Sequence, residues 1–250
     1  MTSVIDLNSD LGEGAGFDDE LLTLVSSANI ACGFHAGDAD TMKRTISAAQ
    51  ARGVAIGAHP SLFDRENFGR TELSVRPEQV FEAVIYQIGV FQAIAESVGA
   101  RANHIKPHGA LYNMAARDRE LADAVVKAVA ATDATLLLFA PGESALASAA
   151  SARGVPVVAE VFADRNYLNN GSLVPRTRPD ALLKDPGEAA LRVVRMLREG
   201  KVKSVEDQDV EIRAETVCVH GDTPGAVAFA RALREHLEKQ GVKIRAPVRQ

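Results

Sequence analysis

Ionisable side chains follow one short apolar segment after another along this sequence of 250 residues. There are seven such segments, and five of the six histidines lie within or just after one of them. Carboxylates, imidazoles and ammonium groups move protons between reacting atoms or bind divalent metal ions. The polar residues at these positions are, in chain order, Asp6, Asn8, Asp10, Glu13, Cys32, His35, Asp38, His59, Asp64, Lys106, His108, Asn113, Glu143, Glu160, Asp164, Arg165, His220 and Asp222.

The apolar segments have the length and composition of strands, and they alternate with helical patterns. Strands are predicted at residues 4–7, 29–31, 55–58, 104–106, 135–139, 157–161 and 217–219, with a last short one at 242–244. Helices are predicted at 18–27, 38–52, 77–98, 118–130, 144–153, 187–198 and 224–239. Residues 162–186 have an irregular pattern, and residues 201–214 have the weak alternation of a hairpin.

Seven strand–helix units without a linker or a change in composition predict one α/β domain over residues 1–250. Short strands that are apolar throughout are typical of a parallel sheet covered by helices. An open doubly wound sheet is the alternative to a closed (β/α) barrel. We favour the barrel, because polar residues follow every strand and do not gather at one switch point. The pattern does not separate seven strands from eight. In a barrel, the ionisable residues would share one mouth.

The composition narrows the class of protein. The 28 basic and 33 acidic residues give a net charge of −5 without a basic tract, so nucleic acids and anionic membranes are not expected as partners. No apolar run approaches the roughly 18 residues of a membrane span. The first residues lack the basic and apolar regions of a signal peptide. Two cysteines are too few for a disulfide scaffold. We therefore expect a cytoplasmic protein.

Two kinds of chemistry fit these residues. Carboxylates and histidines at one mouth can hold a divalent metal ion and activate water, with Asp10, His35 and His59 as the expected ligands. Without a metal, the same groups can act as acids and bases on an amide, while Lys106 or Arg165 binds a substrate carboxylate. The sequence contains no G-x-x-x-x-G-K-[ST] phosphate loop, no H-E-x-x-H zinc motif and no G-x-S-x-G elbow.

Some of the same residues have a structural role as the alternative. Asp38 and Asp222 each precede a predicted helix, and capping that helix is as good an explanation for them as catalysis. Cys32 and Cys218 are expected to be small buried side chains and not nucleophiles. The functional interpretation therefore depends on the whole set of strand-end residues and not on one member.

Six segments carry a resemblance to a known family. They are DLNSDLGE at 6–13, NIACGFHAGD at 29–38, GAHPS at 57–61, KPHGALYN at 106–113, EVFADR at 160–165 and CVHGD at 218–222. In this order, and over about residues 5 to 245, they closely resemble the LamB/YcsF family. The resemblance implies a seven-stranded (β/α) barrel similar to the glycoside hydrolase and metal-dependent polysaccharide deacetylase barrels.

The resemblance also implies an activity. The family takes part in bacterial 5-oxoprolinase, which opens 5-oxo-L-proline (pyroglutamate) to L-glutamate with hydrolysis of ATP and contains two partner subunits, B and C. A lactam is a stabilised amide, and a phosphoryl group from ATP would turn its oxygen into a leaving group. One barrel occupies all 250 residues without a phosphate loop, so the partner subunits are expected to handle much of the ATP chemistry. A divalent metal ion is the second candidate cofactor.

We assign the strand-end residues to roles in this reaction. The candidates for catalysis are Asp10, Glu13, His35, His59, Lys106, His108, Glu160 and His220, and those for substrate binding are Asn8, Lys106, Asn113 and Arg165. A free-standing metal-dependent amide hydrolase or deacetylase is an alternative function. A non-catalytic protein that only presents a ligand or sugar to its partners is another. The many ionisable groups argue against the latter, as does an aromatic content of no Trp and three Tyr, because sugar sites usually have aromatic platforms.

Overall fold

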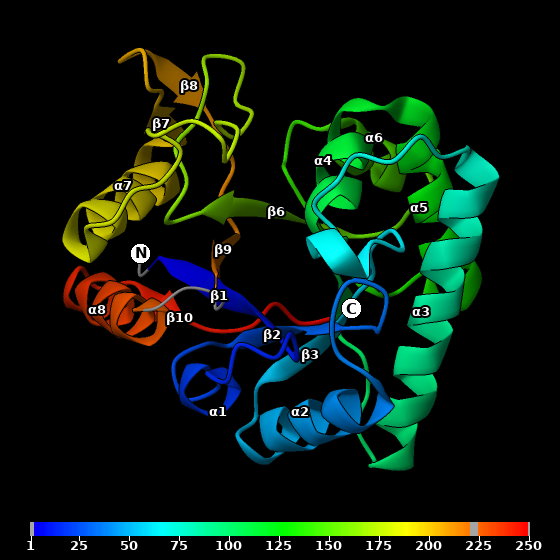
Figure 1. Ribbon diagram of the computed structural model, residues 1–250. Coiled ribbons are helices and arrows are strands. Elements are labelled where there is room, and N and C mark those ends of the chain that lie inside the picture. The colour runs from blue at the N-terminus through cyan, green and yellow to red at the C-terminus, as the bar shows by residue number, and fades with distance from the viewer. Residues whose placement is uncertain (1–2, 221–224, 250) are drawn as a thin grey trace.

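Seven parallel strands pair in a closed ring in the computed structural model of the protein, which describes residues 3–220 and 225–249 (Figure 1). β9 pairs with both β6 and β1, and this pairing closes the barrel. The predicted seven-stranded barrel is therefore confirmed, and the open doubly wound sheet is excluded. The ring consists of β1 (Val4–Leu11), β2 (Ser27–Ala31), β3 (Ala55–His59), β4 (His104–Ile105), β5 (Leu137–Ala140), β6 (Val157–Phe162) and β9 (Thr216–Val219), and β10 (Lys243–Ile244) pairs with the start of β1.

Helices cover the outside of the barrel (Figure 1). The longest, α3 (Pro77–Ser97), begins at a proline, whose fixed φ suits the first helical turn, and it buries an apolar stripe that includes Val84, Ile88 and Phe91. No helix in the described part of the chain is both long and apolar enough to cross a membrane. The other helices are α1 (Asp18–Leu21), α2 (Ala39–Ala51), α4 (Gly109–Arg117), α5 (Arg119–Asp133), α6 (Ala145–Ala152), α7 (Pro186–Glu199) and α8 (Ala226–Lys239), with a 3₁₀ turn at Arg65–Asn67.

The first strand is longer than its apolar residues indicate. β1 continues through the polar residues Asn8, Ser9 and Asp10, all of which are buried. Successive side chains of a strand point to opposite faces, so Asp6, Asn8 and Asp10 share one face while Leu7 lies on the other. The polar face is the inside of the barrel. The predicted strand ended at residue 7 because this alternation of polar and apolar residues resembles a loop.

One predicted helix is shorter in the structure, and one observed helix was not predicted. The helix expected at 18–27 is a single turn, because Ser26 is bound to β1. The Ser26 hydroxyl accepts a hydrogen bond from Leu7 N at 2.9 Å and donates one to Asp6 Oδ1 at 2.6 Å. Helix α4 is not predicted by the sequence pattern, since it starts at Gly109, which has a φ of 53° and is a poor helix former.

A lobe stands beside the barrel, between β6 and β9 in the chain (Figure 1). It contains the irregular segment 162–186, α7, and an antiparallel hairpin of β7 (Lys201–Lys203) and β8 (Asp209–Glu211), so the predicted hairpin is confirmed. Arg192 of α7 donates hydrogen bonds to the carbonyl oxygens of Ala163 and Arg165 at 2.6 and 2.8 Å. These bonds position the chain where it leaves β6.

Candidate active site

A lysine ammonium group lies inside the barrel between two carboxylates. Lys106 Nζ is 2.9 Å from Asp10 Oδ1 and 2.9 Å from Glu160 Oε1. It also donates to Asn8 Oδ1 at 3.3 Å and to Cys218 Sγ at 3.0 Å. All five residues are buried, and we call them the lysine cluster. They come from β1, β6, β9 and the position directly after β4, so closure of the barrel brings them together.

Burial and pairing have opposite effects on the charges of the lysine cluster. Burial acts to lower the pKa of Lys106, but the interactions with Asp10, Cys218 and Glu160 outweigh it and hold the pKa well above its ordinary value. Burial acts to raise the pKa of Asp10, whereas His59 and Lys106 hold it well below its usual range. Lys106 is therefore a cation and a hydrogen-bond donor, and Asp10 is its carboxylate partner.

Asn29 on β2 supports the lysine cluster. Its amide nitrogen donates to Asn8 Oδ1 at 2.7 Å and to Asp10 Oδ1 at 2.8 Å. Its amide oxygen is 2.8 Å from His104 Nε2, and the His104 ring stacks on Phe139 with centroids 4.1 Å apart. Burial lowers the pKa of His104 to about 3, so the ring is a neutral donor to Asn29. His104 is thus a structural histidine that fixes Asn29.

A further carboxylate, Asp6, lies earlier on β1. Its oxygens accept hydrogen bonds from the hydroxyl groups of Ser26 at 2.6 Å, Ser27 at 2.8 Å and Thr216 at 2.5 Å. Burial outweighs these bonds and raises the pKa of Asp6 to about 6. Thr216 Oγ1 accepts from Asn8 Nδ2 at 2.7 Å, so one hydrogen-bonded network runs from Asp6 into the lysine cluster.

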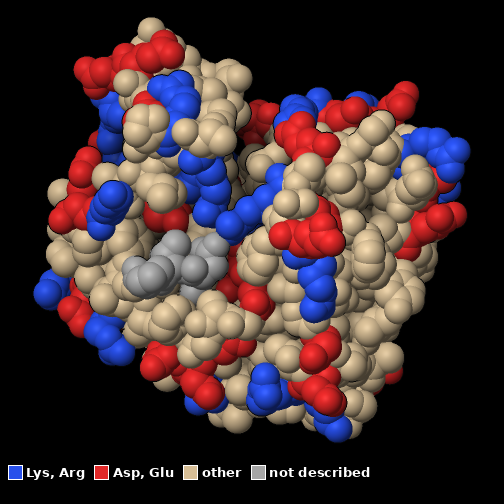
Figure 2. Space-filling view, viewed as in Figure 1, with Lys and Arg blue, Asp and Glu red and all other residues tan. Residues whose placement is uncertain are grey.

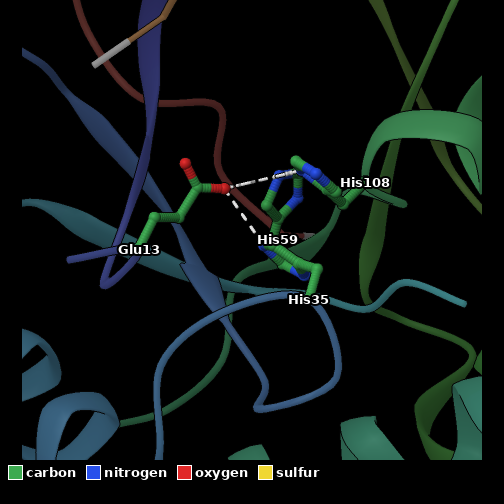
Figure 3. Close-up of side chains that lie close together, drawn as sticks. All are labelled: Glu13, His35, His59 and His108. Carbon is green, nitrogen blue, oxygen red and sulfur yellow. Dashed lines mark hydrogen bonds and ion pairs between the residues drawn. The ribbon is translucent and has the colours of Figure 1, made fainter. Parts of the chain in front are cut away.

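Glu13, His35, His59 and His108 form a second group, which we call the histidine cluster; Figure 3 shows the Glu13 carboxylate facing the three rings. Glu13 Oε1 lies 3.0 Å from His35 Nε2 and 3.5 Å from His108 Nδ1. It is 3.9 Å from His59 Nε2, which is itself 2.9 Å from His108 Nδ1. One ligand atom from each residue lies within 4.8 Å of the others, so the four could hold one metal ion.

Loops position most of the histidine cluster. His59 ends β3, His108 precedes α4, and His35 and Glu13 follow β2 and β1. The loop over them turns at Gly69, where φ is 64° and a Cβ would lie 2.9 Å from both His108 Cδ2 and His35 Cβ. Only glycine fits this position. Burial lowers the pKa of His35 to about 2 and that of His108 well below its usual value, so both rings are neutral.

Several buried polar atoms have no hydrogen-bond partner among the described residues. They include Tyr112 Oη, Glu160 Oε2, Asp164 Oδ1 and Arg165 Nε. Burial, followed by the charge of Glu160, raises the pKa of Tyr112 well above its ordinary value, so this hydroxyl stays protonated. Burial and the nearby charge of Arg176 lower the pKa of Arg165 to about 10. A buried polar group without a partner costs free energy, so these atoms are ready to bind a ligand.

The structure gathers most of the site residues expected from the sequence. Arg165 is buried after β6, and His220, directly after β9, lies with Nδ1 2.8 Å from Asp164 Oδ2 and with its ring stacked on Phe162. Asn113 is the exception, because it lies exposed on α4. The others fall into the two clusters: Asn8, Asp10, Lys106 and Glu160 in the lysine cluster, and Glu13, His35, His59 and His108 in the histidine cluster.

The grouping of metal-ligand types differs from the expected set of Asp10, His35 and His59. Asp10 binds Lys106 and Asn29, and the four-residue group contains Glu13 and His108 in its place. A second group of three potential ligands consists of Asp10, Cys218 and His220. The sequence indicates the residue types at the mouth but not which of them face one another.

Uncharged residues were missed by a search for ionisable strand ends. Asn29 and Tyr112 are examples. The sequence points to them only because both lie in segments that resemble the family. Cys218 is a buried residue, as expected, but it also contacts Lys106. Asp38 caps α2 by accepting a hydrogen bond from Thr41 N at 2.7 Å, and Asp222 lies outside the described residues.

The surface is hollowed between the lobe that carries β7 and β8 and the helices α4 to α6 (Figure 2). Lys and Arg side chains gather along this hollow, and acidic side chains lie beside them. The hollow is wide enough in this view to show charged atoms below the outer surface, so we regard it as the approach to the barrel mouth.

Comparison with known proteins agrees with the six sequence motifs. The model of the LamB/YcsF family matches residues 5–250. The chain belongs to the LamB/YcsF family. A LamB/YcsF relative from Bordetella pertussis, which is named as the A subunit of 5-oxoprolinase, is 47% identical over 251 residues, which cover 98% of this chain and 100% of the relative.

Solved structures agree with the barrel. The lactam utilization protein from Thermus thermophilus has a TM-score of 0.91 and 45% identity, with 98% of this chain and 100% of that chain covered. A T48 deacetylase has a TM-score of 0.50 and 14% identity, with 97% of this chain and 87% of that chain covered. The deacetylase shares the fold alone, whereas the Thermus protein is similar in sequence and fold.

Proposed function

We propose that this chain, as one barrel over residues 1–250, is the lactam-binding and ring-opening component of an ATP-dependent 5-oxoprolinase that converts 5-oxo-L-proline to L-glutamate. The names of two relatives, one a 5-oxoprolinase component and the other a lactam utilization protein, support this function. The structural observation that carries it is the set of buried polar atoms without partners near Lys106. A small lactam acid has matching groups: a carboxylate, an N–H group and a carbonyl oxygen.

Each group of 5-oxo-L-proline has a counterpart among these atoms. Glu160 Oε2 is an acceptor for the lactam N–H, and the protonated Tyr112 hydroxyl is a donor to the lactam oxygen. The Lys106 ammonium group stabilises negative charge that develops on that oxygen. Arg165, with the positive charge of Arg176 nearby, binds the substrate carboxylate. The basic side chains along the hollow attract such an anion (Figure 2).

Ring opening begins when a phosphoryl group passes from ATP to the lactam oxygen and ADP leaves. One water molecule then adds to the carbonyl carbon, and the C–N bond breaks as the nitrogen gains a proton. A second water molecule releases the phosphate and leaves L-glutamate. Glu13 is the group that takes the proton from water, and the neutral rings of His35 and His108, 3.0 and 3.5 Å from its Oε1 atom, position it. Acid–base catalysis by positioned side chains contributes about 10² to 10⁴-fold in rate. In this scheme Asp10 orients Lys106, and His220 with Asp164 is the acid–base pair on the β9 side.

We assign the ATP chemistry to partner subunits. The word subunit in the name of the Bordetella relative implies an assembly, and 5-oxoprolinase subunits B and C are the proposed partners. The chain has no G-x-x-x-x-G-K-[ST] phosphate loop of its own. ATP-dependent metabolism of a small amino acid supports a cytoplasmic location for the reaction.

The direct test is reconstitution. The purified chain is mixed with 5-oxo-L-proline and ATP, alone and with subunits B and C from the same organism, and L-glutamate, ADP and phosphate are measured. We expect one glutamate for each ATP consumed, and only in the complete mixture. Glutamate formation by the isolated chain would contradict the division of labour, and its absence from the complete mixture would contradict the function.

Tyr112→Phe tests the contact with the lactam oxygen. Because the buried hydroxyl lies beside Glu160 and is free of a well-formed hydrogen bond, we expect turnover by the complex to fall about 10² to 10³-fold. The free energy of unfolding should stay within about 0.5 kcal/mol of the wild-type value. Tyr86→Phe is the matched control, since Tyr86 lies 59% exposed on α3 and should retain full turnover. Equal turnover in the two variants would remove Tyr112 from the site.

The histidine cluster favours one alternative function, a metal-dependent amide hydrolase that needs neither ATP nor partners. Turnover of 5-oxo-L-proline or an acetylated sugar by the isolated chain, inhibited by a chelator and indifferent to ATP, would support that alternative over our proposal.

A further inference from the structure

One polar side chain interrupts the apolar stripe of the outer helix α3. Gln87 is fully buried on the face of α3 that also carries Val84, Ile88 and Phe91. A buried amide group costs free energy unless it is hydrogen-bonded. An apolar side chain of similar volume would fill the same space without this cost. The presence of Gln87 therefore needs an explanation beyond packing.

The Gln87 amide holds the main chain of one residue of the barrel. Its oxygen accepts a hydrogen bond from Ser61 N at 3.0 Å, and its nitrogen donates to the carbonyl oxygens of Ser61 and Ala83, both at 2.8 Å. The pairing of β3 with β2 ends at His59. Gln87 thus continues the hydrogen bonding of the main chain two residues beyond the end of β3, as a neighbouring strand would.

The segment that Gln87 holds is attached to the histidine cluster on both sides. Ser61 Oγ lies 3.0 Å from His35 Nδ1. The carbonyl oxygen of Pro60 accepts a hydrogen bond from His108 N at 2.8 Å. Ser61 and Pro60 are both buried, so the segment is enclosed between α3 and the rings. A displacement of this segment would move both rings.

We propose that Gln87 is a positioning residue of the active site. It fixes Ser61 and, through this segment, the two rings that flank Glu13 Oε1 at 3.0 and 3.5 Å. This role rests on the proposed function, in which Glu13 takes the proton from water. The hydrogen bonds of Gln87 end at Ser61 and Ala83, so it acts on the reaction only through other residues.

The position of Gln87 on an outer helix does not prevent a large effect on the rate. Misplacement of a catalytic group by about 1 Å costs about 10²-fold, even when the cause lies far from the reacting atoms. The substrate carboxylate and the lactam N–H are assigned to Arg165 and Glu160, which Gln87 does not contact. We therefore expect a change at Gln87 to lower kcat and to leave KM unchanged.

Gln87→Met is the main test, because methionine has a similar volume and helix propensity but forms neither bond to Ser61. In the reconstituted complex we expect kcat to fall about 10 to 100-fold, with KM within about twofold of the wild-type value. Gln50→Met on α2 is the matched control. The Gln50 amide donates to the carbonyl oxygen of Gly99 at 3.0 Å, and this variant should keep the wild-type kcat. An unchanged kcat in folded Gln87→Met would overturn the proposal.

The ring positions are measured on the isolated chain, without ATP, substrate or partners. In protein with labelled histidines, the NMR signals of the His35 and His108 rings should move in Gln87→Met. The signals of His104 and His236, whose ring nitrogens bind elsewhere, should stay in place. Unmoved His35 and His108 signals would overturn the positioning role. Moved signals together with an inactive wild-type complex would support the positioning of the rings and contradict the proposed function.

Gln87→Glu separates the two bonds to Ser61 from the filling of space. A protonated carboxyl group accepts from Ser61 N and donates to Ser61 O, whereas an ionised one has no hydrogen to donate. We expect Gln87→Glu to recover part of the kcat lost in Gln87→Met at low pH, and to lose this gain as the pH rises. Circular dichroism checks that both variants are folded. A folded Gln87→Glu that is no faster than Gln87→Met at any pH would overturn the proposal.

Discussion

The lysine cluster and the histidine cluster lie at the same end of one barrel, yet they differ in how their polar atoms are matched. In the lysine cluster an ammonium group stands between carboxylates, and each close contact joins a donor to an acceptor. In the histidine cluster three imidazole rings and one carboxylate meet, with His59 Nε2 2.9 Å from His108 Nδ1 and His35 Nε2 3.0 Å from Glu13 Oε1. The first cluster is built around a buried cation and keeps one carboxylate oxygen, Glu160 Oε2, without a partner, whereas the second consists mainly of neutral rings.

The difference follows from where the side chains are attached. Asn8, Asp10, Glu160 and Cys218 belong to strands, and Lys106 comes directly after one. Their geometry is a consequence of the barrel, and the Lys106 cation pairs with both carboxylates because unpaired buried charges would oppose folding. Glu13, His35 and His108 belong to loops, which vary without cost to the barrel. We therefore expect changes in the lysine cluster to affect stability and changes in the histidine cluster to affect ligand binding.

Lys106→Met should have the largest effect. It leaves Asp10 and Glu160 buried without their cation, which should lower the free energy of unfolding by about 3–5 kcal/mol and abolish turnover by the complex. Urea denaturation and glutamate formation measure the two effects. Lys43→Met, on the exposed side of α2, is the control and should change stability by less than about 0.5 kcal/mol. A Lys106 variant as stable as this control would mean that Lys106 does not stabilise the two buried carboxylates.

Asp6→Asn tests the charge at the far end of the same network. In the folded protein Asp6 has a pKa raised to about 6 from 3.8, so it binds a proton more readily than in the unfolded chain. Its contribution to stability is thus full below about pH 4 and is lost as the pH rises to about 6. At about 1.4 kcal/mol per pKa unit, wild type should lose about 3 kcal/mol relative to Asp6→Asn over this range.

Urea denaturation at several pH values provides the measurement for Asp6. Asp40→Asn, an exposed substitution at the start of α2, should stay parallel to wild type over the same range. A constant difference between wild type and Asp6→Asn from pH 4 to pH 6 would show that burial does not govern this carboxyl group.

Gly57→Ala should separate the two clusters with a smaller effect. A Cβ at Gly57 would overlap the ring of His104, which orients Asn29 beneath the lysine cluster. Overpacking of this kind costs about 1–3 kcal/mol, and turnover should fall with it. Gly89→Ala is the control, because Gly89 lies in α3 with open space around it and should gain about 0.5–1 kcal/mol. Full turnover by a folded Gly57→Ala variant would show that the position of His104 does not affect the lysine cluster.

Cys218→Ala should have the smallest effect. Burial raises the pKa of Cys218 well above its ordinary value, so the thiol is a weak partner for Lys106 and not a nucleophile. We expect turnover to fall less than about tenfold, since Asp10 and Glu160 still hold the ammonium group. Loss of turnover as complete as in Lys106→Met would assign Cys218 a direct part in the reaction.

The sequence predicts the closed barrel and most of the residues at its mouth, because each strand ends in polar or ionisable residues. Such residues cost free energy when they are buried without a partner, so their presence at every strand end is informative. It does not predict that β1 continues through buried polar residues. Asn8 and Asp10 give the sequence the polar pattern of a loop, and only their partners across the barrel identify them as part of the strand. Pairing is also hidden, because only the three-dimensional structure assigns Asp10 to Lys106 and leaves Glu13 and His108 with the other histidines. Asn113 shows the reverse error: it follows a strand in the chain but lies on the outside of α4.

The pairing of β1 with β9 has a consequence for synthesis of the chain. Asp6 and Thr216 are hydrogen-bonded although 210 residues separate them. A chain that is still being synthesised therefore holds Asp10, Lys106 and Glu160 without the strand that encloses them, and contacts between such distant segments form late in folding. A product truncated before β9 would keep nearly every candidate residue and have no site. The site is therefore complete only after β9, the last strand of the ring, has been synthesised and has paired with β1.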